Sequence, residues 1–180
     1  MAIGARHSYF GNDSWEKYAY GLKTISDGLK IREKTLLSFE KAERETDKDK
    51  RQKLINFVIV GGGPTGVELA GSIAEIAYRN LLQNFRNFNP EESRVYLIEA
   101  GPQILPMFSK NLSDKARTYL NNFGVIVRTD EKVKSIQKGR VITNNDIIES
   151  ENIIWAAGNQ ASPVLETLNC ELDKQGRAIV

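Results

Sequence analysis

Cysteine and histidine are nearly absent from this 180-residue sequence, which contains only Cys170 and His7. A single cysteine excludes an internal disulfide and a C-x-x-C redox pair within these residues, and it fits a reducing compartment. Cys170 stands between Asn169 and Glu171, so no cationic neighbour favours a reactive thiolate. A lone histidine near one end of a chain is more often a surface residue than a functional one. We also find no metal-ligand spacing and expect no metal site.

Long apolar runs and an excess of one charge are also lacking. No apolar stretch approaches the roughly 18 residues of a membrane span, and no signal peptide is visible. The formal net charge is +2, which is too small to favour nucleic acid as a partner. The densest charged run, residues 47–53, mixes both signs and reads as a solvated linker or helix end. With 41% hydrophobic and 27% charged residues, the chain has the composition of a globular protein of one domain or slightly more.

The most informative segment runs from Leu54 to Gly71 and contains a near-continuous apolar run, a glycine turn and a helix-like pattern. The apolar run 54–60 is typical of a strand that is covered on both faces. The turn that follows fits G-x-G-x-x-G and consists of Gly61, Gly62, Gly63, Pro64, Thr65 and Gly66. A strand, this turn and a helix in that order form the sequence pattern of a dinucleotide-binding βα unit.

The turn residues have separate physical roles in such a unit. Gly61 permits the tight turn, Gly63 lets the backbone approach a pyrophosphate, and Gly66 lets the helix pack closely on the strand. Pro64 suits the first helical position because its missing N–H costs little there. Ala70, four residues after Gly66, adds a second small side chain on the same helix face. The phosphates are then expected at the free backbone N–H groups of the helix N-terminus.

A second apolar strand, residues 94–99, ends in Glu99. An acid at this position of a dinucleotide site hydrogen-bonds a hydroxyl of the adenosine ribose. The distance from the glycines exceeds the usual ~20 residues, which a lengthened helix and loop over residues 80–93 would explain. The alternative interpretation of the whole pattern is a glycine turn that binds no ligand.

The remaining periodicities predict an α/β fold: a Rossmann-like parallel sheet with helices on both faces and a β-meander crossover. We expect residues 1–22 to be irregular, and Asp27 to be available as a cap for a helix at about 26–44. The other expected helices are 65–83 and about 113–122, and the expected strands are 125–128, 133–137, 140–143, 147–149 and 152–155.

Several residues permit both a functional and a structural interpretation. Glu68 is turned away from the sheet-facing side of its helix, so it faces either solvent or a second domain near the expected phosphate site. Ala157 and Gly158 end the last strand with small residues that would let a flat ring approach the backbone, or simply make a turn. We expect Phe85 and Phe88 to staple a long loop to the core, and residues 105–108 to form a packed loop rather than an exposed apolar lip.

Five segments together resemble the two-dinucleotide flavoprotein reductases, and within them the type II, non-proton-pumping NADH dehydrogenases. In chain order these segments are GARHSYFGNDSWEKYA, FVIVGGGPTGVELAGSIAEIA, LIEAGPQILP, FGVIV and IIWAAG followed by ASP. The GGGPTGVELAG and WAAG blocks are specific for the type II enzymes. The glycine fingerprint and FGVIV belong to the wider superfamily.

The resemblance implies an NADH-binding domain at 54–158, set between a partial FAD-domain segment with a linker helix at 1–53 and a return into the FAD domain at 159–180. It places the NADH pyrophosphate at residues 61–66 and the ribose at Glu99. It also places Glu68 where nicotinamide, flavin and quinone sites meet, and Ala157 and Gly158 near nicotinamide and flavin. No arginine directly follows Glu99, which favours NADH over NADPH.

For the complete enzyme the resemblance implies hydride transfer from NADH to FAD, then delivery of two electrons to a quinone. It implies a cytoplasmic protein that lies peripherally on the inner face of the membrane. A homodimer is one assembly that the resemblance allows. The flavin fingerprint glycines and the C-terminal membrane-docking helices of the family are not in this sequence, so we expect a piece of a longer polypeptide that is inactive alone. The alternatives are another FAD/NAD(P)H reductase of the superfamily and a non-catalytic nucleotide-binding or redox-sensing module.

Overall fold

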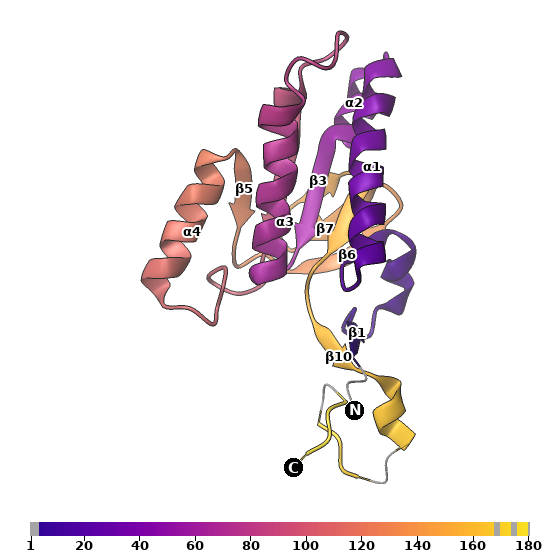
Figure 1. Ribbon diagram of the computed structural model, residues 1–180, viewed down its shortest axis with the longest axis vertical. Helices are drawn as coiled ribbons and strands as arrows, with labels where there is room; N and C mark the ends of the chain where they lie inside the picture. The colour runs from indigo at the N-terminus through magenta and orange to yellow at the C-terminus, as the bar shows by residue number, and fades with distance from the viewer. Residues whose placement is uncertain (1–3, 168–169, 174–175, 180) are drawn as a thin grey trace.

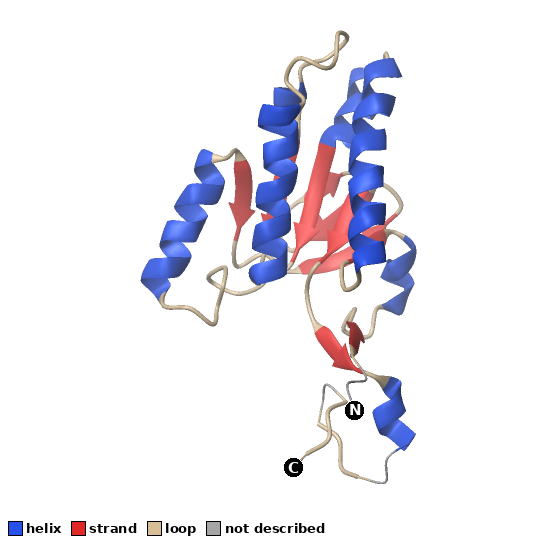
Figure 2. Cartoon of the chain, in the orientation of Figure 1, coloured by secondary structure: helices blue, strands red, loops and turns tan. Residues whose placement is uncertain are grey.

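The computed structural model of the protein describes residues 4–167, 170–173 and 176–179. Its centre is a five-stranded sheet in the order β2-β9-β3-β4-β5, in which every neighbouring pair is parallel (Figures 1 and 2). These strands span Ala19–Gly21 (β2), Asn56–Val60 (β3), Arg94–Ile98 (β4), Val125–Arg128 (β5) and Asn152–Trp155 (β9). The α/β class and the parallel sheet predicted from the sequence are confirmed.

Helices connect the parallel strands. The α-helices span Ile25–Arg44 (α1), Lys48–Ile55 (α2), Pro64–Glu75 (α3) and Lys110–Asn122 (α4). A π-helical turn, Ile76–Asn80, extends α3. Short 3₁₀ helices lie at Asp13–Lys17, Pro90–Glu92 and Pro163–Thr167. The long connection between α3 and β4 therefore accounts for the wide spacing between the glycine turn and Glu99.

Two smaller sheets complete the fold. An antiparallel meander consists of Val133–Gln137 (β6), Arg140–Thr143 (β7) and Ile147–Glu149 (β8). Its chain then re-enters the main sheet as β9, which is the crossover expected from the sequence. Ala5–His7 (β1) pairs antiparallel with Asn159–Ala161 (β10), and this ribbon lies below the main sheet in Figure 1.

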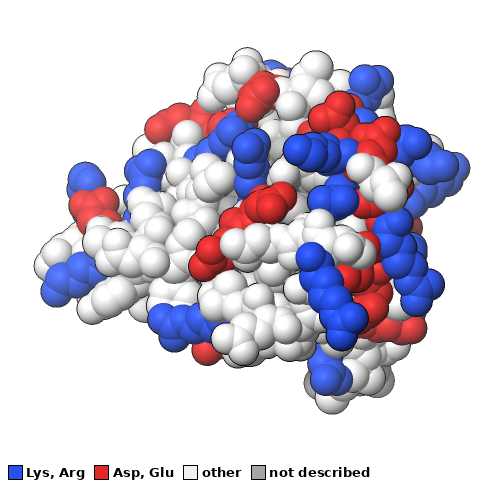
Figure 3. All heavy atoms as spheres, turned by 90° about the horizontal axis from the view of Figure 1, so that it is seen from above, with Lys and Arg blue, Asp and Glu red and all other residues white. Residues whose placement is uncertain are grey.

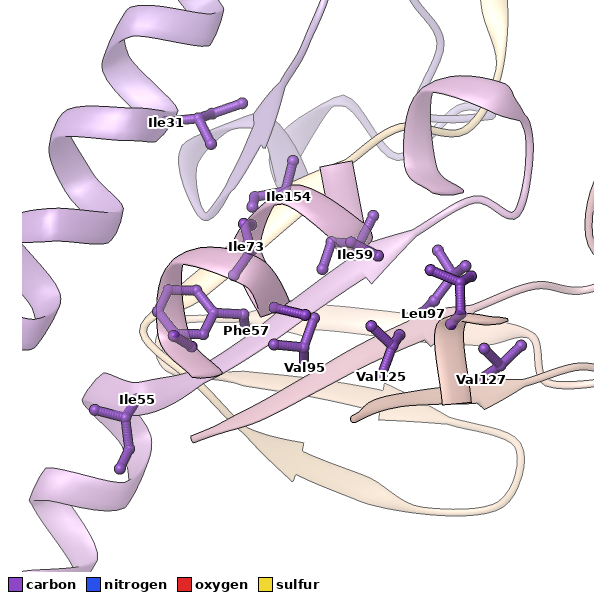
Figure 4. Close-up of a cluster of buried hydrophobic side chains, with 14 of the residues drawn as sticks. Ile31, Ile55, Phe57, Ile59, Ile73, Val95, Leu97, Val125, Val127 and Ile154 are labelled. Carbon is purple, nitrogen blue, oxygen red and sulfur yellow. The ribbon is translucent and has the colours of Figure 1, made fainter. Parts of the chain in front are cut away.

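The strands of the main sheet alternate between two hydrophobic cores because successive side chains point to opposite faces. Phe57, Ile59, Val95 and Leu97 face the core under α1, α3 and α4, with the neighbours that Figure 4 labels. The alternate positions face a second core shared with the meander and the N-terminal aromatic residues, namely Val58, Val60, Tyr96, Ile98, Ile153 and Trp155.

The elements that pack on the two faces of the sheet differ from the prediction, which placed helices on both faces. Helices α1, α3 and α4 all contribute to the first core, so they cover one face. The meander and the 3₁₀ helix that carries Trp15 cover the other face. An antiparallel meander buries an apolar face as well as a helix does, and its strands were predicted correctly.

Other corrections concern element boundaries. Leu54 and Ile55 end α2 rather than begin the strand, and the charged run before them is the body of that helix. Predicted helix 65–83 is regular only to Glu75, after which it is π-helical to Asn80. The described part of the segment that was expected to be irregular, residues 4–22, contains the strands β1 and β2.

The cap of α1 was also misassigned. Thr24 is the N-cap: its hydroxyl accepts a hydrogen bond from the Asp27 backbone N–H, and the Asp27 carboxylate accepts one from the Thr24 backbone N–H, which forms a capping box.

Surface features test two further expectations. Phe88 is buried and Phe85 half-buried, and both rings stack near Phe39 of α1, so the predicted staple is confirmed. Met107 and Phe108 are 70% and 46% exposed, so the expectation of a packed loop was wrong for these two residues. Seen from the upper end of Figure 1, Lys and Arg are interspersed with Asp and Glu, in keeping with the small net charge (Figure 3).

Candidate functional site

The glycine turn joins the carboxyl end of β3 to the start of α3. Gly61 has φ +115°, which side chains rarely tolerate, and its N–H donates to the Ile98 carbonyl over 2.8 Å. A Cβ on Gly61 would lie 2.7 Å from the backbone nitrogen of Ala157, and one on Gly66 would overlap the carbonyl oxygen of Gly61. Both glycines thus permit close backbone packing, and Gly66 and Ala70 are buried as the spacing predicted.

Gly63 lies in the opposite environment. A Cβ built there meets nothing within 4 Å, so the glycine leaves free space in front of the helix. Gly63 is the N-cap of α3 and has no side chain that could accept hydrogen bonds from the first backbone N–H groups of the helix. Pro64, the first helical residue, has no backbone N–H. The positive end of the helix dipole therefore meets open space, which suits an anion such as a pyrophosphate.

Glu99 lies directly after β4 and bridges two loops. Its Oε2 accepts a hydrogen bond from the Gly62 N–H and its Oε1 one from the Gly101 N–H, both at 2.7 Å. The carboxylate is half-buried beside the glycine turn. Since a carboxylate oxygen can accept more than one hydrogen bond, both oxygens can still receive a ligand hydroxyl.

These groups border one cavity of about 710 Å³ at the carboxyl ends of the parallel strands. This is the edge where open α/β sheets bind ligands. Of the residues that the sequence singled out, the cavity is lined by Gly61, Gly63, Pro64, Thr65, Glu99, Ala157 and Gly158. Gly62 and Gly66 are buried behind the turn.

Glu68 is exposed on α3 and does not line this cavity. Its outward orientation is as the helical spacing predicted. A functional role for Glu68 stays a prediction. Among the described residues, no group of His, Cys, Asp and Glu could hold a metal ion.

The N-terminal segment forms a wall of the cavity that sequence reasoning missed. The buried Trp155 indole donates to the Ser8 carbonyl over 2.8 Å and stacks on Tyr9, with Trp15 edge-on. Phe10, 67% exposed, closes over Gly158, where a Cβ would lie 2.7 Å from its ring. The only signal in the sequence was an aromatic-rich start, which does not say where the rings pack.

His7 and Lys23 also line the cavity and were not singled out as site residues. His7 is half-buried, with its ring against Gly21, rather than on the open surface. Burial lowers the pKa of His7, while the negative charge of Asp27 acts in the opposite direction. The Lys23 ammonium donates to the Asn159 side chain and so ties the end of β2 to β10.

Glu131, another cavity residue, is the buried member of a charged group that also contains the half-buried Arg128 and the exposed Asp146. Arg128 donates to Glu131 over 3.3 Å and to Asp146 over 3.0 Å, and its guanidinium lies over the Tyr96 ring. Burial alone would lower the pKa of Arg128, but the two carboxylates outweigh it and the pKa is raised. No sequence motif marked this cluster, because Arg128 ends β5, Glu131 lies in the connection to β6, and Asp146 lies in the turn between β7 and β8.

A parallel sheet with an uncapped helix after a glycine turn, and an acid at the end of the next strand, defines a dinucleotide-binding α/β fold. The family model for pyridine nucleotide-disulphide oxidoreductases matches residues 1–180. The chain belongs to this family.

Individual relatives agree with this assignment. Over 190 residues the chain is 42% identical to the type II NADH:quinone oxidoreductase NdhA of Mycobacterium tuberculosis, covering all of this chain and 40% of that protein. It is 32% identical to a probable NADH dehydrogenase of Dictyostelium discoideum, again over all of this chain and 40% of the relative. The structure of NDH2 from Plasmodium falciparum in complex with NADH superposes with a TM-score of 0.86 at 28% identity, covering 96% of this chain and 36% of that one. The chain thus spans about 40% of the length of these two curated relatives.

Proposed function

We propose that this chain carries the NADH-binding part of a flavin-dependent NADH:quinone oxidoreductase. The observation that carries the proposal is that the uncapped N-terminus of α3 and the carboxylate of Glu99 border the same cavity. One group suits a pyrophosphate and the other a ribose hydroxyl, and a dinucleotide carries both. The similarity to type II NADH:quinone oxidoreductases supports NADH as that dinucleotide.

In this proposal the pyrophosphate lies against the backbone of residues 61–66 and the adenosine ribose binds Glu99. The nicotinamide then extends toward Ala157 and Gly158, which border the cavity two strands away from Glu99. Residues 54–158 are the NADH-binding domain, and 1–53 and 159–180 belong to an FAD domain.

The flavin supplies the redox chemistry, because it accepts a hydride and passes electrons on singly or in pairs. The contribution of this chain is to bind and orient the nicotinamide. The sequence has one G-x-G-x-x-G turn, which we assign to NADH. In a longer protein of this family, FAD would then be held chiefly by regions that correspond to the parts of the relatives outside the match with this chain.

Glu68 is the one side chain that we assign to catalysis. Its exposure on α3, outside the cavity wall, leaves it free to face a flavin or quinone bound by another part of a longer protein. A carboxylate there could order water or relay protons.

The whole protein would deliver its electrons to a quinone from the inner surface of a membrane, and a homodimer is its proposed assembly. No helix in the described ranges is long and apolar enough to cross a membrane.

Titration of the purified chain with NADH and NADPH tests the proposal. NADH should quench the fluorescence of Trp15 and Trp155, which both line the cavity, along a saturable curve. NADPH should bind at least about 10-fold more weakly, since Glu99 would face its 2′-phosphate. Equal affinities for the two nucleotides would rule out the ribose assignment, and an unchanged signal with both would contradict nucleotide binding.

A further inference from the structure

Glu131 is a buried carboxylate on the wall of the cavity, at the point where the chain leaves β5 for the meander. Its residue exposure is only 4%, yet it lines the cavity together with Lys132 and Val133. Its backbone N–H donates to the carbonyl of Glu99 over 3.0 Å, so the two acids are held side by side at the end of the sheet. The position of Glu131 is therefore fixed relative to the proposed ribose site.

The two carboxylate oxygens of Glu131 differ in their surroundings. Oε1 accepts hydrogen bonds from the Arg128 guanidinium over 3.3 Å and from the Thr143 hydroxyl over 2.7 Å. Oε2 accepts none from any described residue. Throughout the described ranges, the one fully enclosed side-chain polar atom without a partner is Ser93 Oγ, so Oε2 is not sealed in the core and retains contact with open space. Glu131 lines the cavity, which is therefore the open space available to its side chain.

A buried carboxylate oxygen without a donor is costly, and proteins place one where a ligand or ordered water supplies the hydrogen bond. The Arg128 guanidinium also donates to Asp146 over 3.0 Å and lies over the Tyr96 ring, and its hydrogen bond to Glu131 goes to Oε1. The geometry therefore leaves a preformed hydrogen-bond acceptor in the cavity wall, next to Glu99.

We propose that Glu131 Oε2 accepts a hydrogen bond from the 6-amino group of the adenine of the bound dinucleotide. This inference rests on the proposed function, in which Glu99 holds the adenosine ribose. The base is attached to that ribose, and Glu131 provides the polar atom adjoining Glu99 on the wall. The 6-amino group is the one strong donor on the edge of adenine, and a carboxylate can only accept, so the two groups are complementary.

The test compares NADH with reduced nicotinamide hypoxanthine dinucleotide, in which a carbonyl oxygen replaces the 6-amino group and the neighbouring N1 gains a hydrogen. The wild-type chain should bind NADH about 10-fold more tightly, because the carbonyl oxygen would face Oε2 with no hydrogen between them. In Glu131→Gln, Arg128 and Thr143 would hold the amide oxygen in the Oε1 position, which places the amide NH₂ toward the base. Compared with the wild type, Glu131→Gln should then bind NADH about 10-fold more weakly and the hypoxanthine analogue more tightly, so that the preference between the two nucleotides reverses.

Asp146→Asn is the matched control. It removes the second negative charge beside Arg128 but keeps a side-chain oxygen that can accept the hydrogen bond from the guanidinium, and Asp146 does not line the cavity. Its preference for NADH should equal that of the wild type. If Glu131 has a purely structural role, Glu131→Gln will weaken the binding of NADH and of the hypoxanthine analogue by the same factor. This result would overturn the inference.

Measurements on the wild-type chain alone provide a second test, which does not depend on whether the variant folds. Equal affinities of the wild type for NADH and the hypoxanthine analogue would also overturn the inference, although NADH binding itself would still support the proposed function. Failure of the wild type to bind NADH at all would instead contradict the proposed function.

Discussion

Gly66 and Gly71 lie in the same helix but have very different surroundings. At Gly66 a Cβ would overlap the carbonyl oxygen of Gly61, which is backbone and cannot move aside easily. At Gly71 a Cβ would make an ordinary contact of 3.8 Å with the side chain of Leu120. The pair therefore separates the requirement for close packing from the general effect of glycine in a helix.

We expect Gly66→Ala to lower the free energy of unfolding by about 3 kcal/mol, because the helix must move away from the turn. Gly71→Ala should raise it by about 0.5–1 kcal/mol, the usual gain of alanine over glycine in a helix. Urea denaturation followed by circular dichroism measures both. Equal effects of the two substitutions would show that the contact at Gly66 is not tight.

Glu68 and Glu99 are the two acids near α3 to which we assign functions, and NADH binding should distinguish them. Glu99 lines the cavity and Glu68 does not. In the isolated chain, Glu99→Gln should weaken NADH binding about 10-fold, because a charge-assisted hydrogen bond to the ribose is lost. Glu68→Gln should change it by less than about twofold, as is usual for an exposed position. Isothermal titration calorimetry gives both affinities, and a large loss in Glu68→Gln would place the nucleotide elsewhere.

At the residue scale, the sequence was most informative where neighbours in the chain are also neighbours in space. The turn residues of 61–66 and Glu99 could be proposed because the fingerprint encodes a local shape. His7 and Glu131 could not, since they reach the cavity only through the pairing of β1 with β10 and the passage from β5 to the meander. Such positions depend on the tertiary fold, and no local pattern marks them.

Among the elements, the start of α1 responds to pH through its capping box. The Thr24 and Lys23 N–H groups donate to the Asp27 carboxylate over 2.8 and 3.1 Å. These bonds, chiefly the one from Thr24, hold the pKa of Asp27 below its usual 3.8. A carboxyl group with a lowered pKa in the folded state stabilises the fold in full above its unfolded pKa, and this contribution is lost as the pH falls through the folded value.

Asp27→Asn should therefore lower the stability of the chain at pH 7 and at pH 5. Its difference from the wild type should shrink as the pH falls below the usual aspartate pKa of 3.8. Thermal unfolding at a series of pH values measures this difference. A constant difference over the whole range would show that the charge on Asp27 does not contribute.

The elements that were predicted well and those that were missed differ in a physical way. Strands β4 to β9 were found because their apolar residues recur with period two or in short runs between turn signals. The boundary between α2 and β3 was misplaced because Leu54 and Ile55 are apolar for a different reason, as the last turn of a helix that packs on the first core. Periodicity cannot separate a short helical end from the strand that follows it at once.

On the scale of the whole molecule, the N-terminal segment is part of the same body as the sheet. Strand β2 pairs with β9, and Tyr9 and Trp15 pack in the core around Trp155. The sequence could not predict this arrangement, because these contacts join residues that lie more than a hundred positions apart. The cavity therefore depends on the N-terminal segment and on residues 155–159 as well as on the glycine turn.

The central claim is that the space in front of Gly63 holds the pyrophosphate of NADH, and Gly63→Ala tests it most directly. A Cβ at this position meets no protein atom within 4 Å, so the variant should fold with a loss of at most about 1 kcal/mol at the N-cap. The methyl group would nevertheless occupy space that the pyrophosphate needs. Isothermal titration calorimetry should show NADH binding at least about 10-fold weaker in Gly63→Ala than in the wild type, with Gly71→Ala unchanged. An equal affinity of Gly63→Ala and the wild type for NADH would contradict the claim.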